Sequence, residues 1–225
     1  MLKTIPILLT SFVLSTLSAS EQLVIVLSPE LNATVASMQR YEMKNQWVKI
    51  GHKIPVILGR SGLGYLRDKM PLKNEGDGRS PAGMFPITST FGYSEIPNSA
   101  MPYYHADEKL ICIDDVEDSR YNMFALLDSS TLPKSFEAMR RNDEVYRNGA
   151  VIGYNIMGEK GRGSCIFIHL NHSDHRPTSG CTAMDEAPLI ELLKWLDPAK
   201  KPHILQIPIK DCAEYQKEFA GIECE

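Results

Sequence analysis

A cysteine and a histidine late in the chain have the types and the spacing of a nucleophile and its base. His169 ends an apolar run that begins at Cys165, and Cys181 follows Gly180 in a short polar segment. A cysteine thiol is mostly protonated near pH 7 and attacks carbonyl groups as the thiolate, so it needs a neighbouring imidazole or polarising backbone groups. We predict that Cys181 attacks, that His169 takes its proton, and that turn amides around Ser179 and Gly180 bind the oxyanion.

These residues meet if Ile166–Leu170 forms a strand and Thr178–Cys181 turns back beside it. Gly180 permits a close backbone approach in that turn, and the polar residues 171–177 supply the loop. The Leu170 carbonyl would then orient the second ring nitrogen of His169. The alternative is that Cys181 is half of a disulfide and His169 an ordinary strand-end residue.

A zinc site is a second hypothesis, because His169, His172 and His175 recur every three residues ahead of Cys181. A spacing of three suits a helix, whereas the residues up to His169 have the pattern of a strand. The sequence also contains no His-Glu-x-x-His and no Cys-x-x-Cys motif. We therefore expect no metal and no other cofactor, and a solvated loop for His172 and His175.

A second motif, Glu75–Phe85, reads Glu-Gly-Asp-Gly-Arg-Ser-Pro-Ala-Gly-Met-Phe. Gly76 and Gly78 favour turns and Pro81 fixes a bend. We predict that this segment leads into a strand over 85–91.

Together the two motifs resemble those of the L,D-transpeptidase catalytic-domain (YkuD-type) family. That family has a strand His followed by Ser/Thr-His-Gly-Cys, usually with an Arg two residues beyond the Cys, and a Gly-Asp-Gly-Arg/Lys-Thr/Ser-Pro-x-Gly-x-Phe element. The matching positions of the first motif are His169, Thr178, Gly180 and Cys181. Three features depart from it: Ser179 replaces the second His, Ala183 replaces the Arg, and the spacer is shorter. The resemblance extends over 23–206.

The resemblance implies a mainly β (α+β) fold, a sandwich or barrel with a few packed helices. It also implies acyl transfer through a thioester on peptidoglycan stem peptides, with attack between the third residue and the terminal D-alanine. An amine acceptor gives a cross-link, whereas water gives a trimmed tripeptide by L,D-carboxypeptidase action. A third alternative is a non-catalytic peptidoglycan-binding envelope protein, which predicts a buried or oxidised Cys181.

The missing Arg at position 183 leaves the substrate carboxylate without its usual partner. Arg176 in the same loop and Arg79 after the glycine turn are the candidates from the sequence, and a solvent-facing position is the alternative for each. Tyr154 lies on the strand before the loop, where it either lines the cleft or packs in the core.

The N-terminus has the pattern of a cleaved secretory signal. Lys3 precedes the apolar stretch 5–17, which ends in small residues and is shorter than the ~20 residues of a membrane helix. We predict a signal peptide over 1–19, a single catalytic domain over 20–225 and a periplasmic location without a membrane span. The formal net charge of −4, spread along the chain, argues against a nucleic-acid partner, and the sequence identifies no protein partner.

Five cysteines in an exported chain leave at least one unpaired. If Cys181 is the free thiol, the remaining four allow three pairings. Pairing Cys212 with Cys224 would close a short loop and leave Cys112 with Cys165, but the sequence leaves the connectivity open.

The hydrophobic pattern favours strands in most of the chain. We predict strands over 22–27, 55–58, 151–156 and 203–208, and a hairpin of 33–42 with 47–50. We predict helices over 132–142, from composition, and over 185–196, where leucines recur at helical spacing.

Overall fold

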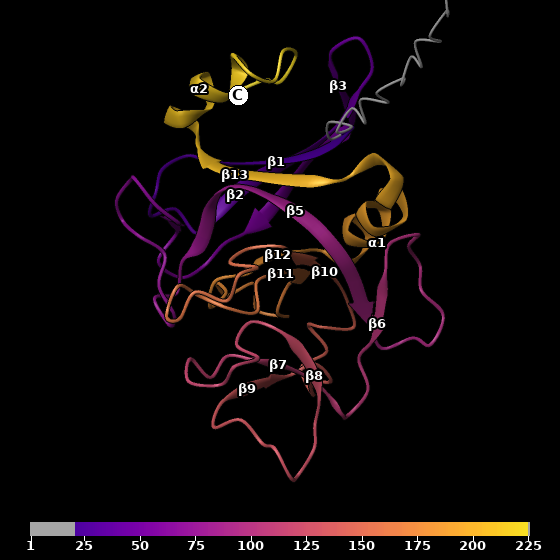
Figure 1. Ribbon diagram of the computed structural model, residues 1–225. Helices are drawn as coiled ribbons and strands as arrows, with labels where there is room; N and C mark the ends of the chain where they lie inside the picture. The colour runs from indigo at the N-terminus through magenta and orange to yellow at the C-terminus, as the bar shows by residue number, and fades with distance from the viewer. Residues whose placement is uncertain (1–20, 225) are drawn as a thin grey trace, which may run out of the picture.

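The main sheet of the protein closes on itself. The computed structural model describes residues 21–224, and its ten-stranded sheet has the order β10-β11-β12-β3-β2-β1-β13-β5-β4, with β6 pairing with β5. A further pairing of β10, at one end of this path, with β5, next to its other end, closes the sheet into a barrel (Figure 1). The predicted mainly β fold with few helices is confirmed.

The strands and helices have the following bounds: β1 Gln22–Ser28, β2 Val35–Met43, β3 Trp47–Ile57, β4 Leu63–Tyr65, β5 Ser80–Gly92, β6 Tyr103–His105, β7 Leu110–Ile113, β8 Phe124–Leu126, β9 Phe136–Ala138, β10 Asn148–Ile152, β11 Phe167–Leu170, β12 Thr182–Met184, α1 Glu186–Trp195, β13 His203–Pro208 and α2 Cys212–Gln216. Two short 3₁₀ helices, Pro198–Lys200 and Ile209–Asp211, flank β13.

The central strand β1 is buried along its whole length. It pairs in parallel with β13 and antiparallel with β2, so both of its edges are occupied. The predicted hairpin is present as β2 and β3, and the predicted strand at 55–58 is the continuation of β3 beyond a bulge.

Helix α1 confirms the second predicted helix. Leu189, Leu192, Leu193 and Leu196 are at most 1% exposed and belong to the core cluster inside the barrel. Burial of one leucine face stabilises a short helix that would be marginal alone.

The helix predicted over 132–142 is wrong. Its central residues, 136–138, form β9, which pairs with β7 in a separate three-stranded sheet of order β8-β7-β9. Hydrogen bonds to a strand distant in the sequence override the local helix propensity here. The small sheet lies beyond β10–β12 from the rest of the barrel (Figure 1).

The strand predicted over 151–156 ends early. Strand β10 stops at Ile152, and Asn155 has a positive φ of 49°. The Asn122 side chain donates to the carbonyls of Tyr154 and Asn155, both at 2.8 Å, which satisfies backbone groups that would otherwise need a neighbouring strand.

Two disulfides join Cys112 to Cys165 and Cys212 to Cys224, and Cys181 is free. The first links the small sheet to the segment before β11, and the second closes the C-terminal segment after β13.

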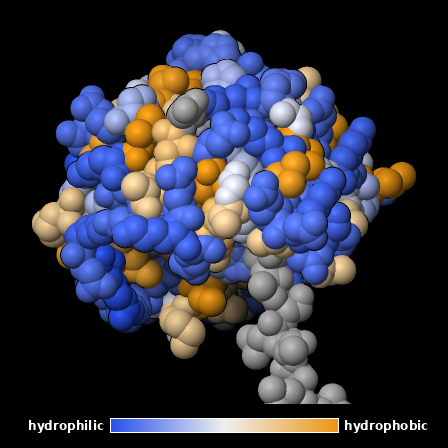
Figure 2. Space-filling model, turned by 90° about the horizontal axis from the view of Figure 1, so that it is seen from above, coloured by the Kyte–Doolittle hydropathy of each residue, from blue (hydrophilic) through white to orange (hydrophobic). Residues whose placement is uncertain are grey.

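Hydrophilic side chains cover most of the face seen in Figure 2, with apolar ones in small groups among them. Within residues 21–224, none of the helices has the length and apolar character needed to span a bilayer. The predicted signal peptide over 1–19 lies outside the described residues.

Candidate active site

Cys181 and His169 face the same cavity, which has a volume of about 290 Å³. Strands β11 and β12 are parallel neighbours, and His169 pairs with Ala183, two residues after Cys181. Side chains alternate along a strand, so positions 181 and 183 share the face of His169. This register brings the two residues together across a polar loop.

The ring of His169 is oriented by the backbone. Its Nδ1 lies 2.7 Å from the Leu170 carbonyl oxygen, the contact expected from the sequence. Because a carbonyl only accepts, Nδ1 carries the proton and Nε2 is the basic nitrogen. The residue is 3% exposed, and burial lowers its pKa to about 4. His169 is therefore neutral at physiological pH.

The thiol of Cys181 is reduced and 7% exposed. The Phe167 amide donates to its Sγ at 3.3 Å, and the thiol donates to the Cys165 carbonyl at 3.5 Å. Burial and then the charge of Glu137 raise the pKa of Cys181 to about 12, against the lowering effects of the Phe167 amide, Lys73 and Arg141. The resting pair is thus a neutral thiol and a neutral imidazole.

The turn before Cys181 is held by side-chain hydroxyl groups. Thr178 Oγ1 and Ser80 Oγ donate to the Cys181 carbonyl at 2.7 and 2.8 Å, and the Gly180 amide donates to Thr178 Oγ1 at 3.1 Å. Gly180 has a φ of 153°, and a Cβ at this position would lie 3.0 Å from the Arg79 carbonyl oxygen. Glycine is favoured here because the second motif packs directly behind the turn that precedes Cys181.

The second motif also delivers a cation to the cavity. Asp77 Oδ1 accepts from Lys73 Nζ at 2.9 Å and from the Arg79 amide at 2.8 Å. Lys73 is 2% exposed and lines the cavity beside Cys181. Its charge favours the thiolate, as its lowering effect on the pKa of Cys181 indicates.

The three substrate-binding candidates do not line this cavity. Arg176 is exposed and pairs with Asp174 at 3.1 Å. Arg79 Nη1 donates to the carbonyls of Ser61 and Leu63, so it braces the loop around β4.

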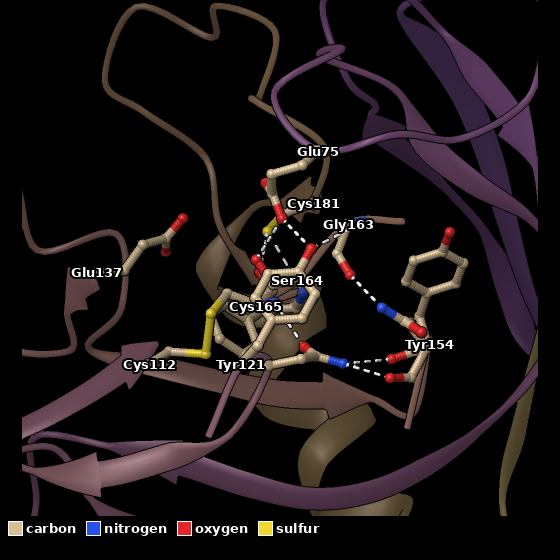
Figure 3. Close-up of a disulfide and its surroundings, with 12 residues drawn as sticks. Glu75, Cys112, Tyr121, Glu137, Tyr154, Gly163, Ser164, Cys165 and Cys181 are labelled. Carbon is tan, nitrogen blue, oxygen red and sulfur yellow. Dashed lines mark hydrogen bonds between the residues drawn. A yellow bond between two sulfur atoms is a disulfide. The ribbon is translucent and has the colours of Figure 1, made fainter. Parts of the chain in front are cut away.

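Tyr154 belongs to the core. It is 1% exposed, and its hydroxyl donates to the Arg162 carbonyl. In Figure 3 Tyr154 and Glu137 lie on opposite sides of the segment that carries Cys165. Tyr154 borders a second cavity, of about 240 Å³, which shares Cys165 and Ile166 with the first.

Other residues at the cavity were not singled out from the sequence. They are Arg141, Tyr146, Asp114 and Glu137, all from the segment between β6 and β10, of which only 132–142 had a predicted structure, the helix that is wrong. Arg141 lies 5.0 Å from the ring centroid of Tyr146, which in turn lies 5.3 Å from the His169 ring. In the sequence this region carries an adjacent pair of arginines, Arg140 and Arg141, which has no characteristic spacing to the motifs.

His172 lines the cavity, whereas His175 does not. Over the described range 21–224, no group of three or more His, Cys, Asp or Glu side chains could hold a metal ion.

Comparison with known proteins identifies the family of the chain. Residues 32–205 match the family model YkuD, the L,D-transpeptidase catalytic domain. Searches of curated proteins and of solved structures gave no match. The chain therefore belongs to the L,D-transpeptidase catalytic domain family, whose domains act on peptidoglycan.

Proposed function

We propose that the protein is a cysteine-dependent acyltransferase acting on peptidoglycan stem peptides. The observation that carries this proposal is the shared cavity of a free Cys181 and a His169 whose Nδ1 is fixed by the Leu170 carbonyl. That geometry leaves Nε2 as the base in a domain of the matching family.

Acylation begins when Sγ of Cys181 attacks the carbonyl carbon of the third stem residue. Nε2 of His169 takes the thiol proton as the carbon–sulfur bond forms. The tetrahedral intermediate collapses with cleavage of the bond to the terminal D-alanine, whose amine receives the proton from His169. An acceptor amine or water then attacks the thioester, gives its proton to His169 and releases the thiol.

The backbone amides on either side of Gly180 are the candidates for binding the oxyanion. The Gly180 amide is already bound to Thr178 Oγ1 at 3.1 Å. We therefore assign the role to the amides of Ser179 and Cys181, a refinement of the turn predicted from the sequence.

Arg141 is the proposed partner of the substrate carboxylate in place of Arg176 and Arg79. It lines the cavity, and its charge lowers the pKa of both Cys181 and His169, so it acts on both reacting groups. Ala183, where the family usually has an Arg, is 1% exposed and offers no charge.

Replacing Arg141 with glutamine should lower kcat/KM about 10- to 100-fold, the range expected when a hydrogen bond to a charged group is lost. The matched control is Arg176→Gln, which removes an exposed guanidinium outside the cavity and should leave the steady-state kinetics unchanged. If Arg176→Gln lowered kcat/KM and Arg141→Gln did not, Arg176 would be the partner of the substrate carboxylate instead.

The pH dependence of kcat/KM should follow the neutral form of His169. Because burial lowers its pKa to about 4, the base stays deprotonated through mildly acidic pH, and activity should fall only as pH drops through about 4. A solvated imidazole would lose activity near its ordinary value of about 6.5.

This profile is measured at sub-saturating donor concentration. His175→Asn serves as the control, because its ring lies outside the cavity and asparagine tolerates the positive φ of 52°. An acid limb near 6.5 in the wild type would contradict the neutral, buried base.

Mass spectrometry of the purified protein with a disaccharide tetrapeptide, with and without an acceptor stem, tests the function. A cross-linked dimer identifies a transpeptidase, and a tripeptide without dimer identifies an L,D-carboxypeptidase. Absence of both products and of an acyl adduct would favour the non-catalytic peptidoglycan-binding alternative, which the burial of Cys181 also fits.

The location follows from the substrate. We propose that residues 1–19 are a secretory signal and that residues 20–225 act as one domain in the periplasm. N-terminal sequencing of the protein recovered from a periplasmic extract tests the cleavage site.

A further inference from the structure

The second cavity lies directly behind the wall of the catalytic cavity. It has a volume of about 240 Å³, and Cys165 and Ile166 belong to the linings of both cavities. Figure 3 shows Glu137, which lines the catalytic cavity, and Tyr154, which lines the second one, on opposite sides of Cys165. The two cavities therefore lie within reach of one extended substrate.

The two cavities differ in charge. Among the residues that the structure describes, none with a charged side chain lines the second cavity, whereas Arg60, Lys73 and Arg141 line the catalytic one together with carboxylates. A stem peptide carries ionised carboxylate and amine groups, and burial of a charge without a partner is costly. The second cavity therefore suits a neutral ligand.

Two hydroxyl groups in the second cavity are available to such a ligand. Ser89 is 6% exposed, and neither its Oγ nor the Thr88 Oγ1 has a hydrogen-bond partner within residues 21–224. The Asn122 side chain is fully engaged, since it donates to two backbone carbonyls and accepts from the Cys165 amide at 2.9 Å. Buried polar groups are normally hydrogen-bonded, so Ser89 marks the place where a polar group of a ligand would complete the network.

A β-bulge places both hydroxyl groups at the same cavity. The register of β5 against β10 shifts between Val151 and Ile152, which leaves Thr88 without a partner residue beside Ser89. Side chains normally alternate between the two faces of a strand, whereas a bulge re-aims one of them. Gly153 makes room for this arrangement, because a Cβ there would lie 2.9 Å from Thr88 Cγ2. The bulge is therefore part of the construction of the cavity.

Aromatic and apolar side chains complete the second cavity. Tyr104 of β6 is 43% exposed, and its ring packs edge-to-face on that of Phe124 with the centroids 4.8 Å apart. Met123 and Ile156 also line the cavity and are exposed. A sugar ring presents C–H groups on its faces and hydroxyl groups at its edge, so an exposed aromatic ring beside free hydroxyl groups suits it.

We infer that the second cavity is a subsite for a neutral, N-acetylated sugar of the glycan strand that carries the stem peptide. The inference rests on the proposed function, since it takes the catalytic cavity as the site of the stem peptide. Three extended stem residues span at most about 11 Å, so the sugar at their other end lies close to the catalytic cavity. Ser89 and Thr88 would bind the polar groups of the sugar, and Tyr104 would pack on its apolar face.

Two tetrapeptide donors, one attached to the disaccharide and one without it, test this subsite. Release of D-alanine from each donor gives its kcat/KM. The wild type should show a kcat/KM at least about 10-fold higher for the glycosylated donor, as expected for one or two added hydrogen bonds and a ring contact. The double variant Ser89→Ala, Tyr104→Ala should bring this ratio close to one.

The matched control is Phe136→Ala, which removes another exposed aromatic side chain, one that lines neither cavity. It should keep the wild-type ratio. A second comparison, with the disaccharide on the acceptor amine, identifies which glycan is bound, because a preference confined to that comparison would assign the subsite to the acceptor. Wild-type ratios near one in both comparisons, or a double variant that still discriminates, would overturn the inference. The wild-type comparisons need no variant to fold.

Binding of a sugar without a peptide tests the subsite independently of turnover. The probe is diacetylchitobiose, a neutral disaccharide of N-acetylglucosamine, titrated into Cys181→Ala and followed by amide chemical shifts. The shifts should centre on Ser89 and Tyr104, and the double variant in the same background should lose them. The deacetylated disaccharide carries ammonium groups and should bind more weakly, because the second cavity offers no countercharge. Shifts that avoid these two residues would overturn the subsite.

The subsite and the proposed function can fail separately. Binding of the disaccharide at Ser89 and Tyr104, without any product from the wild type, would overturn the acyl transfer and leave the subsite in place. Product formed equally well from substrates with and without the sugar, together with no binding of the disaccharide, would overturn the subsite and leave the acyl transfer in place.

Discussion

Replacing Cys181 with alanine is expected to lower turnover of a tetrapeptide donor by at least about 10⁴-fold, because no other group can form the thioester. Cys181 belongs to the apolar cluster between β11 and the small sheet, so removal of its sulfur should cost only about 1 kcal/mol of unfolding free energy. Steady-state kinetics and thermal unfolding of the same preparation measure both effects.

Intact-mass analysis provides the control for this variant. The wild type should form an acyl adduct with a carbapenem, as the family resemblance implies, and Cys181→Ala should form none. Retained turnover in the alanine variant would exclude Cys181 as the nucleophile.

Removing the Cys112–Cys165 disulfide should lower both the free energy of unfolding and the activity. The two cysteines are separated by 53 residues, for which loop-closure entropy predicts a loss of about 4 kcal/mol. The bond also ties the small sheet to the residue whose carbonyl accepts from the Cys181 thiol. We expect the double variant Cys112→Ala, Cys165→Ala to lose both unfolding free energy and kcat/KM.

The second disulfide offers a matched control. Cys212 and Cys224 are 12 residues apart, which predicts a loss of about 3 kcal/mol, and neither residue lines the cavity. Denaturant unfolding of Cys212→Ala, Cys224→Ala should therefore show destabilisation without a fall in kcat/KM of the folded fraction. Equal losses of activity in the two double variants would show that the first bond has no special role at the site.

Several features could be predicted from the sequence because short-range patterns specify them. The apolar run Leu23–Leu27 within β1 and the leucine face of α1 are visible as local patterns. The contact of His169 with the Leu170 carbonyl joins adjacent residues, and the need for Gly180 follows from a tight turn beside a strand. Two motifs of matching type and order were enough to indicate the family.

The tertiary structure alone decided the walls of the cavity. Arg141, Asp114 and Glu137 reach Cys181 through the pairing of β7 with β9 and a disulfide to the segment before β11. The same pairing turned a segment of helical composition into a strand. The tertiary structure also fixed a cysteine connectivity that the sequence left open. Such contacts depend on the free energy of the whole packed arrangement, which no local pattern of residues carries. The sequence therefore determined the motif of His169 and Cys181 and its family, whereas the fold determined which charges surround that motif.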